Sequence, residues 1–158
     1  MKRAIALVLL TVLILCGCSA KTKTPFYYCR SNFQNVPIES IFASESRDVT
    51  GHEHQLNFLI SLYLMGPSAK DYVNPFPADV HLQSTEITGN RLTVHLTSMD
   101  AVSDSRFSIA SACMALTCFE ISRYETVTIV SGSRSITLNA NMLTLNDSNI
   151  PTDTTTGG

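Results

Sequence analysis

Residues 80–97 read VHLQSTEITGNRLTVHLT, two runs in which apolar and polar side chains alternate. Alternation with a period of two is typical of a β-strand that buries one of its faces. In the second run the apolar side chains are Leu92, Val94 and Leu96. Gly89 and Asn90 separate the runs, and both residue types tolerate the positive φ angles of a tight turn. The pattern predicts a β-hairpin, with a bulge where the alternation of the first strand changes between Leu82 and Ile87.

An amphipathic helix is predicted before the hairpin, over residues 52–65. Its apolar residues recur at helical spacing, as Leu56, Leu59, Ile60, Tyr63 and Leu64. Gly66 and Pro67 follow the last turn, an order that commonly ends a helix. Thr50 is a candidate cap at the start of the helix. Residues 68–77 are expected to form a loop that leads to the hairpin.

A second helix is predicted after the hairpin, over residues 107–120, with Ser103 or Asp104 as its cap. Many of its residues are small, which lets a helix lie close to a sheet. A strand is predicted at residues 126–130, and a turn at Gly132 leads to a possible continuation. That continuation covers residues 135–138.

Two further strands are predicted near the N-terminus, at residues 26–30 and, more weakly, at residues 37–47. The order of elements is then strand, strand, helix, strand, strand, helix, strand. Hairpins and helices mixed in this way favour an α+β fold, in which two helices pack on one face of a small mixed sheet.

The N-terminus has the pattern of a lipoprotein signal peptide. Lys2 and Arg3 precede an apolar run at residues 4–15, and about a dozen apolar residues suit a secretory signal and are short for a membrane span. Leu-Cys-Gly-Cys at residues 15–18 then resembles a bacterial lipobox. We expect the thiol of Cys18 to carry diacylglycerol, with palmitate-like chains, and cleavage just before it. An uncleaved anchor helix is the alternative, and both place the remaining chain outside the cytoplasm on the cell membrane.

The sequence is therefore divided into a signal peptide (1–17), a tether (18–25), one domain (26–146) and a disordered tail (147–158). The tail is rich in Thr, Asp and Gly and has little to bury. The formal net charge is −2, and it becomes more negative once the signal peptide is removed. With no basic patch to hold phosphates, nucleic acid is not expected as a partner.

No group of residues has the spacing of a catalytic or metal site. His52 and His54 are two positions apart, whereas zinc-binding helices place two histidines four apart. His81 and His95 fall in the two hairpin strands, where an exposed pair of surface histidines is expected. Neither a Gly-x-Ser-x-Gly motif nor a glycine-rich phosphate loop occurs. We therefore expect no enzyme activity, no cofactor and no metal.

Three cysteines remain in the domain after Cys16 and Cys18 are assigned to the signal and the lipid. Cys113 and Cys118 are five positions apart in a predicted helix, so they point about 140° apart and do not easily bridge each other. Two alternatives stay open. Either one of them pairs with Cys29, or all three are buried thiols.

The pattern as a whole resembles the GerM domain, a family known from bacterial sporulation and germination lipoproteins. The resemblance covers about residues 26–145. It lies in the helix end LYLMGP at 62–67, the hairpin with LTVHL at 92–96, the run ALTCF at 115–119, and Gly132 after the strand at 126–130. The sequence departs from the family in two ways. It holds one such domain where some members hold two, and its second helix is rich in Cys, Ser and Met.

The resemblance implies a non-enzymatic domain related to the ring-building motifs of secretion-like assemblies. Its partners would be envelope proteins or further copies of itself, in a sporulation or germination complex. We expect association through an exposed face of the helix at residues 107–120 and through edge strands.

Two alternative functions follow from other residues. An envelope lipoprotein that binds a cell-wall fragment or small ligand would line its pocket with aromatic side chains, here Phe26, Tyr27, Tyr28, Tyr72 and Phe76. An exported enzyme that uses a thiol would need a histidine close in space to one of the cysteines.

Overall fold

The computed structural model describes residues 21–32, 37 and 40–142. The predicted signal peptide, the lipid-bearing Cys18 and the predicted tail at 147–158 lie outside these residues. None of the described helices has the length and apolar character of a membrane span.

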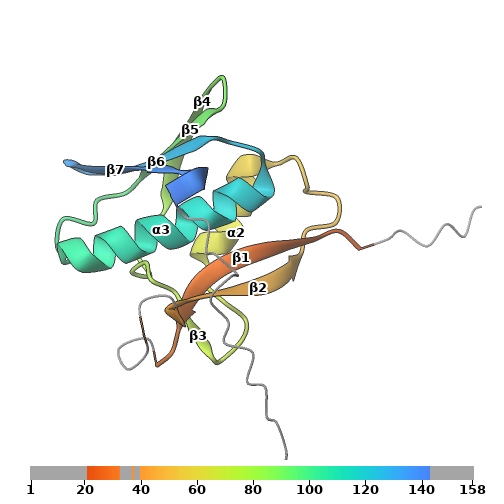
Figure 1. The fold of residues 1–158 in the computed structure, drawn as a ribbon, viewed down its shortest axis with the longest axis horizontal. Helices are drawn as coiled ribbons and strands as arrows, with labels where there is room; N and C mark the ends of the chain where they lie inside the picture. The colour runs from red at the N-terminus through yellow and green to blue at the C-terminus, as the bar shows by residue number, and fades with distance from the viewer. Residues whose placement is uncertain (1–20, 33–36, 38–39, 143–158) are drawn as a thin grey trace, which may run out of the picture.

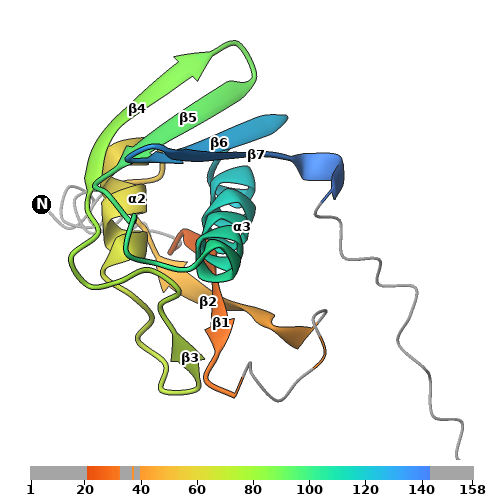
Figure 2. The same ribbon diagram turned by 90° about the vertical axis from the view of Figure 1, so that its left-hand side faces the viewer.

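The described residues form three layers, in which two helices lie between two β-sheets (Figure 1 and Figure 2). The larger sheet has the strand order β4-β5-β6-β7, and the smaller sheet has the order β2-β1-β3. In chain order the elements are β1 (Lys23–Arg30), β2 (Phe42–Asp48), α2 (Leu56–Leu64), β3 (Tyr72–Val73), β4 (Leu82–Thr88), β5 (Arg91–Leu96), α3 (Asp104–Ile121), β6 (Thr126–Ser131), β7 (Arg134–Asn139) and the short 3-10 helix η3 (Ala140–Met142).

This arrangement confirms the predicted α+β class. The larger sheet is mixed, because β5 and β6 run parallel while its other neighbouring strands are antiparallel. Both helices lie against one face of it, as predicted (Figure 2). The smaller sheet, which the sequence did not separate from the larger one, covers the opposite side of the helices (Figure 2).

The predicted hairpin is β4 and β5. The register shifts between Leu82 and Ser84, which confirms the predicted bulge in the first strand. Gly89 has a φ of +57°, whereas Asn90 does not have a positive φ. A positive φ at the first central residue alone is the pattern of a type II′ turn, one of the two turns whose twist suits a hairpin.

The second predicted helix, α3, is the crossover between the parallel strands β5 and β6. Ser103 caps it, and its hydroxyl oxygen accepts a hydrogen bond from the backbone N–H of Arg106 at 3.4 Å. Ala110, Cys113 and Ala115 are fully buried along the helix. These small side chains let a sheet approach the helix closely on either side.

The first helix is shorter at its start than predicted. It begins at Leu56, and its N-cap is Gln55, which makes no side-chain capping hydrogen bond. Thr50 is therefore not the cap. Its hydroxyl instead donates to the carboxylate of Asp48 at 2.7 Å, in a turn before the helix. The Asp48 carboxylate lies only two residues away, so the Thr50 hydroxyl bonds to it instead of to the start of the helix.

The strands near the N-terminus also differ from their predicted ranges. β1 begins at Lys23, so the end of the predicted tether (18–25) belongs to the sheet. The predicted loop at 68–77 contains β3, which pairs with the end of β1. Two residues are too few to give a periodic pattern, so β3 depends on the partner strand that the fold brings to it.

Candidate functional site

Two of the three cysteines meet in the core. Cys29 lies near the end of β1 and Cys113 lies in the middle of α3, and their Sγ atoms are 3.8 Å apart. All three described cysteines are free thiols. Cys118 lies one and a half turns further along α3, fully buried and without a cysteine neighbour within the described chain. Of the two pairings that the sequence left open, the fold brings together Cys29 and Cys113.

The environments of the three thiols differ. The hydrogen bond with Cys113 lowers the pKa of Cys29 below its ordinary value, against the opposing effect of burial, and the positive charge of Arg106 acts in the same direction. The same hydrogen bond and deep burial raise the pKa of Cys113 well above its ordinary value. Burial alone raises the pKa of Cys118 to about 12. Cys29 is therefore the thiol that ionises most easily.

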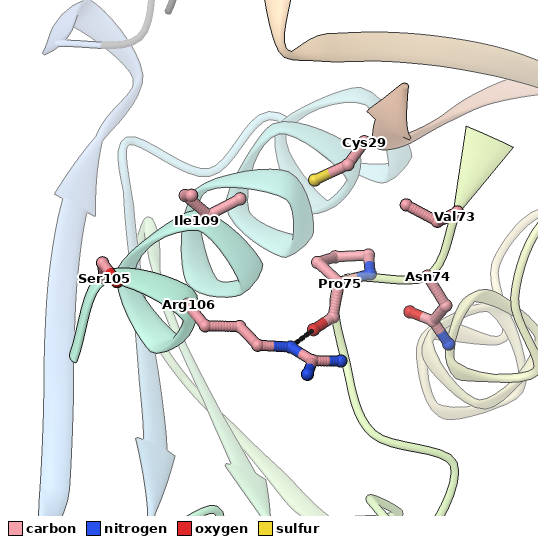
Figure 3. A pocket seen from close by; sticks show the side chains of 7 residues that line it. All are labelled: Cys29, Val73, Asn74, Pro75, Ser105, Arg106 and Ile109. Atoms are coloured by element: carbon pink, nitrogen blue, oxygen red, sulfur yellow. Dashed lines mark hydrogen bonds between the residues drawn. The ribbon is translucent and has the colours of Figure 1, made fainter. Parts of the chain in front are cut away.

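A cavity of about 400 Å³ opens beside Cys29. It lies between α3, β3 and the chain that follows β3, and it is lined by Cys29, Val73, Asn74, Pro75, Ser105, Arg106 and Ile109 (Figure 3). The Nε atom of Arg106 donates a hydrogen bond to the carbonyl oxygen of Pro75 at 3.2 Å, which fixes the side chain across the cavity. This volume lies within the range of small-molecule sites.

The aromatic side chains expected to line a ligand pocket are not at this cavity. Phe26, Tyr28 and Phe76 are buried and pack around Tyr63. Tyr28 stacks on Tyr63 with 4.9 Å between ring centroids, and Phe26 and Phe76 each make an edge contact at 6.0 Å. Tyr27 and Tyr72 are half-buried and also do not line the cavity. The aromatic cluster is hydrophobic core.

The histidines do not form a site. The register pairs His95 with Ser84, so His81 and His95 do not lie opposite each other as the predicted surface pair would. The Nε2 atom of His95 lies 3.3 Å from a carboxylate oxygen of Glu86. His52 stacks on Phe58 at 4.1 Å. Within the described residues, no group of three or more His, Cys, Asp or Glu side chains is placed to hold a metal ion.

The surfaces expected to bind partners are of two kinds. Most of α3 is covered by the sheets, and between residues 107 and 120 only Ser108 and Glu120 are exposed. The edge strands offer more. β4 forms one edge of the larger sheet, and it exposes Ile87 with 57% of its surface accessible. An exposed strand edge with an apolar side chain is a common place for another chain to pair.

The arrangement of layers and strands is similar to that of a solved structure. The tandem GerMN domains of the sporulation protein GerM from Bacillus subtilis match it with a TM-score of 0.50 and 20% sequence identity, over 74% of this chain and 41% of that chain. The domain has a GerMN-like fold. The resemblance inferred from sequence is thus confirmed at the level of fold, and the chain spans less than half the length of that structure.

Other comparisons give no further information about the fold or the function. A predicted lipoprotein from Clostridium perfringens matches with a TM-score of 0.42 and 15% identity, over 77% of this chain and 89% of that chain, a likeness too weak to carry an argument. No protein-family model matches the sequence, and no curated protein matches it.

Proposed function

We propose that this chain is an extracytoplasmic lipoprotein, held on the membrane by lipid on Cys18, whose GerMN-like domain binds other proteins. The partners would be envelope proteins or further copies of the chain, in a sporulation or germination complex. The role would be binding and not catalysis.

The observation that carries this proposal is a GerMN-like fold that follows directly after a sequence resembling a lipobox. Leu-Cys-Gly-Cys at 15–18 offers a thiol for acylation, and β1 begins at Lys23, shortly after it. Two acyl chains bury enough methylene groups, at about 0.8 kcal/mol each, for stable anchoring. A tether this short would keep the domain close to the membrane surface.

The edge of β4 supports a binding role. Ile87 is exposed on a strand whose outer backbone groups have no strand partner in the described sheet. A partner that adds a strand there would satisfy these groups and bury Ile87. An uncovered edge strand is open to unwanted pairing with other chains, and a partner bound there would cover it.

The anchor is tested with two single substitutions in the full chain. Cys18→Ala should abolish labelling by an alkyne analogue of palmitate and leave an uncleaved precursor. Cys16→Ala is the matched control, since this thiol precedes the expected cleavage site, and it should label and process as the wild type does. Equal labelling of the two variants would contradict the assignment of Cys18.

The interface is tested by chemical cross-linking in intact membranes. Ile87→Asp should shift cross-linked species of the wild type to the size of the monomer. Met142→Asp is the control, because Met142 is 73% exposed and follows β7, which forms the opposite edge of the larger sheet from β4. A wild type that is monomeric in its native membrane would contradict the proposed binding role.

The cavity beside Cys29 favours a second candidate function, the binding of a small anionic ligand such as a cell-wall fragment. Arg106 lines the cavity and carries the positive charge that such a ligand would need. Muropeptides should then raise the melting temperature of the wild type in proportion to their concentration, and Arg106→Gln should remove the rise. No rise at millimolar muropeptide would exclude this candidate.

A further inference from the structure

Two cysteines that are far apart in the sequence meet between the smaller sheet and α3. The Sγ atoms of Cys29 and Cys113 are 3.8 Å apart, although 84 positions separate the residues along the chain. A disulfide bond is about 2.05 Å long, so the two sulfur atoms need to approach by roughly 2 Å. We expect rotation about the Cα–Cβ bonds of the two residues, which carries each Sγ atom along an arc, to bring the sulfur atoms together.

The geometry points to a disulfide bond between Cys29 and Cys113 in the exported protein, with Cys118 left as a free thiol. This rests on the proposed function, because disulfides persist in oxidising compartments outside the cytoplasm. Cys118 is a poor alternative partner, since it lies five residues further along α3, and it is Cys113 whose sulfur atom contacts that of Cys29.

The oxidant would be another disulfide, either a small molecule or a protein. The Cys29 thiol releases its proton, and its sulfur attacks one sulfur of the oxidant, which releases the other sulfur as a thiolate. The Cys113 thiol then loses its proton, and its sulfur attacks the Sγ atom of Cys29 and displaces the remaining oxidant sulfur. The two protein thiols lose two electrons and two protons, and the oxidant gains them to become two thiols.

The cavity explains why Cys29 reacts first. Cys29 lines it and Cys113 does not, and the Cys29 side chain is directed from the end of β1 towards α3 (Figure 3). Arg106 lies in the same cavity and favours a thiolate there. Cys113 is shielded behind Cys29, in the position of a resolving thiol that attacks only after the mixed disulfide has formed.

The bond would join the anchored end of the domain to its centre. β1 is the first strand after the tether, and it lies in the middle of the smaller sheet, between β2 and β3. Any pull from a lipid on Cys18 enters the domain through β1. A Cys29–Cys113 disulfide would pass this pull directly to α3, so that β1 does not have to hold by hydrogen bonds and packing alone.

The first experiment uses the full wild-type chain, purified in detergent and equilibrated in glutathione buffers from reducing to oxidising. The chain is then denatured so that buried thiols also react, its free thiols are blocked with N-ethylmaleimide, and it is digested and analysed by mass spectrometry. We expect a peptide containing Cys29 joined to one containing Cys113, with Cys118 carrying the label. Three labelled thiols in fully oxidising buffer, or a bond that includes Cys118, would overturn the inference.

Matched variants give a second readout. Oxidation should raise the melting temperature of the wild type by about 10 °C, as expected for a disulfide that closes a long loop. Cys118→Ala should keep this difference between oxidised and reduced protein, whereas Cys113→Ala should lose it. If Cys113→Ala does not fold, the peptide map of the wild type still decides the pairing. An equal response of wild type and Cys113→Ala would overturn the inference.

The same map made on cells quenched with N-ethylmaleimide separates this inference from the proposed function. A Cys29–Cys113 bond in cells supports both. A pair that is reduced in cells, while Cys18 carries lipid, would overturn the disulfide and leave the anchor standing. An unlipidated Cys18 with the pair reduced in cells but oxidised in buffer would overturn the proposed location and keep the pairing chemistry.

Discussion

The hydroxyl of Tyr63 provides a sharp test of the core. Tyr63 is 1% exposed, and its ring lies at the centre of the aromatic cluster. Its hydroxyl oxygen is buried and has no hydrogen-bond partner among the described residues. The hydroxyl of Tyr28 differs, since it donates to the backbone carbonyl of Tyr63 at 3.1 Å. The two tyrosines stack on each other, so they offer a matched pair of Tyr→Phe substitutions.

The expected effects have opposite signs. Burial of an unpaired hydroxyl costs roughly 1–3 kcal/mol, so Tyr63→Phe should raise the free energy of unfolding by about 1 kcal/mol. Tyr28→Phe removes a made hydrogen bond and should lower it by about 1 kcal/mol. The carbonyl of Tyr63 would still accept from the N–H of Gly66 at 3.0 Å, which limits this loss.

Urea denaturation followed by circular dichroism measures both changes, and about 1 kcal/mol corresponds to roughly 4 °C in the melting temperature of a domain of this size. The comparison should be made on the reduced protein, so that the cysteine pair does not contribute. A Tyr63→Phe variant that is less stable than the wild type would refute the reasoning, because it would mean that the hydroxyl makes a favourable interaction.

Three further predictions concern other parts of the domain. Gly132→Ala should destabilise by about 2 kcal/mol in urea denaturation, because Gly132 has a φ of +59° and an added Cβ would lie 2.8 Å from a carboxylate oxygen of Asp100; an unchanged midpoint would contradict this. Thr117→Val should lower the free energy of unfolding by about 1–2 kcal/mol in the same assay, since the Thr117 hydroxyl accepts a hydrogen bond from the backbone N–H of Tyr27 at 2.9 Å. An unchanged free energy of unfolding would mean that this contact between α3 and β1 does not stabilise the domain. The pKa of Cys118 is raised to about 12 in the folded state, so the stability that comes from keeping this thiol protonated is complete below pH 9 and is lost as the pH rises towards 12. Between pH 8 and 11 the free energy of unfolding should therefore fall less in Cys118→Ala than in the wild type. Equal falls in the two proteins would refute this prediction.

The elements with a clear period were predicted from sequence, and those that depend on distant partners were not. The hairpin, its bulge and both helices follow from local alternation, helical spacing and turn residues. β3 has two residues and exists because the fold places it beside β1. The division into two sheets is likewise set by which strands meet in space, and local patterns do not report this.

At the candidate site, too, the sequence predicts local relations between cysteines but not which of them meet in the fold. The helical spacing of Cys113 and Cys118 argues against a bond between them, and both are free thiols in the structure. The choice between the two as a neighbour of Cys29 depends on which face of α3 the smaller sheet covers. That choice is made by tertiary packing, through contacts such as that of Thr117 with Tyr27. The aromatic residues also fit a ligand surface on sequence alone, because composition does not distinguish a pocket from a core.

The layered arrangement gives the proposed anchor and the proposed interface separate places. The chain from Cys18 would enter the smaller sheet through β1, on one side of the helices. The larger sheet lies on the other side, with β4 at its edge (Figure 2). β4 carries the exposed Ile87. A lipid on Cys18 would therefore hold the layer opposite the binding edge, and the edge would stay accessible when the domain is close to the membrane. The helix α3 connects the two layers, so a bond between Cys29 and Cys113 would strengthen the path between the anchor and the partner.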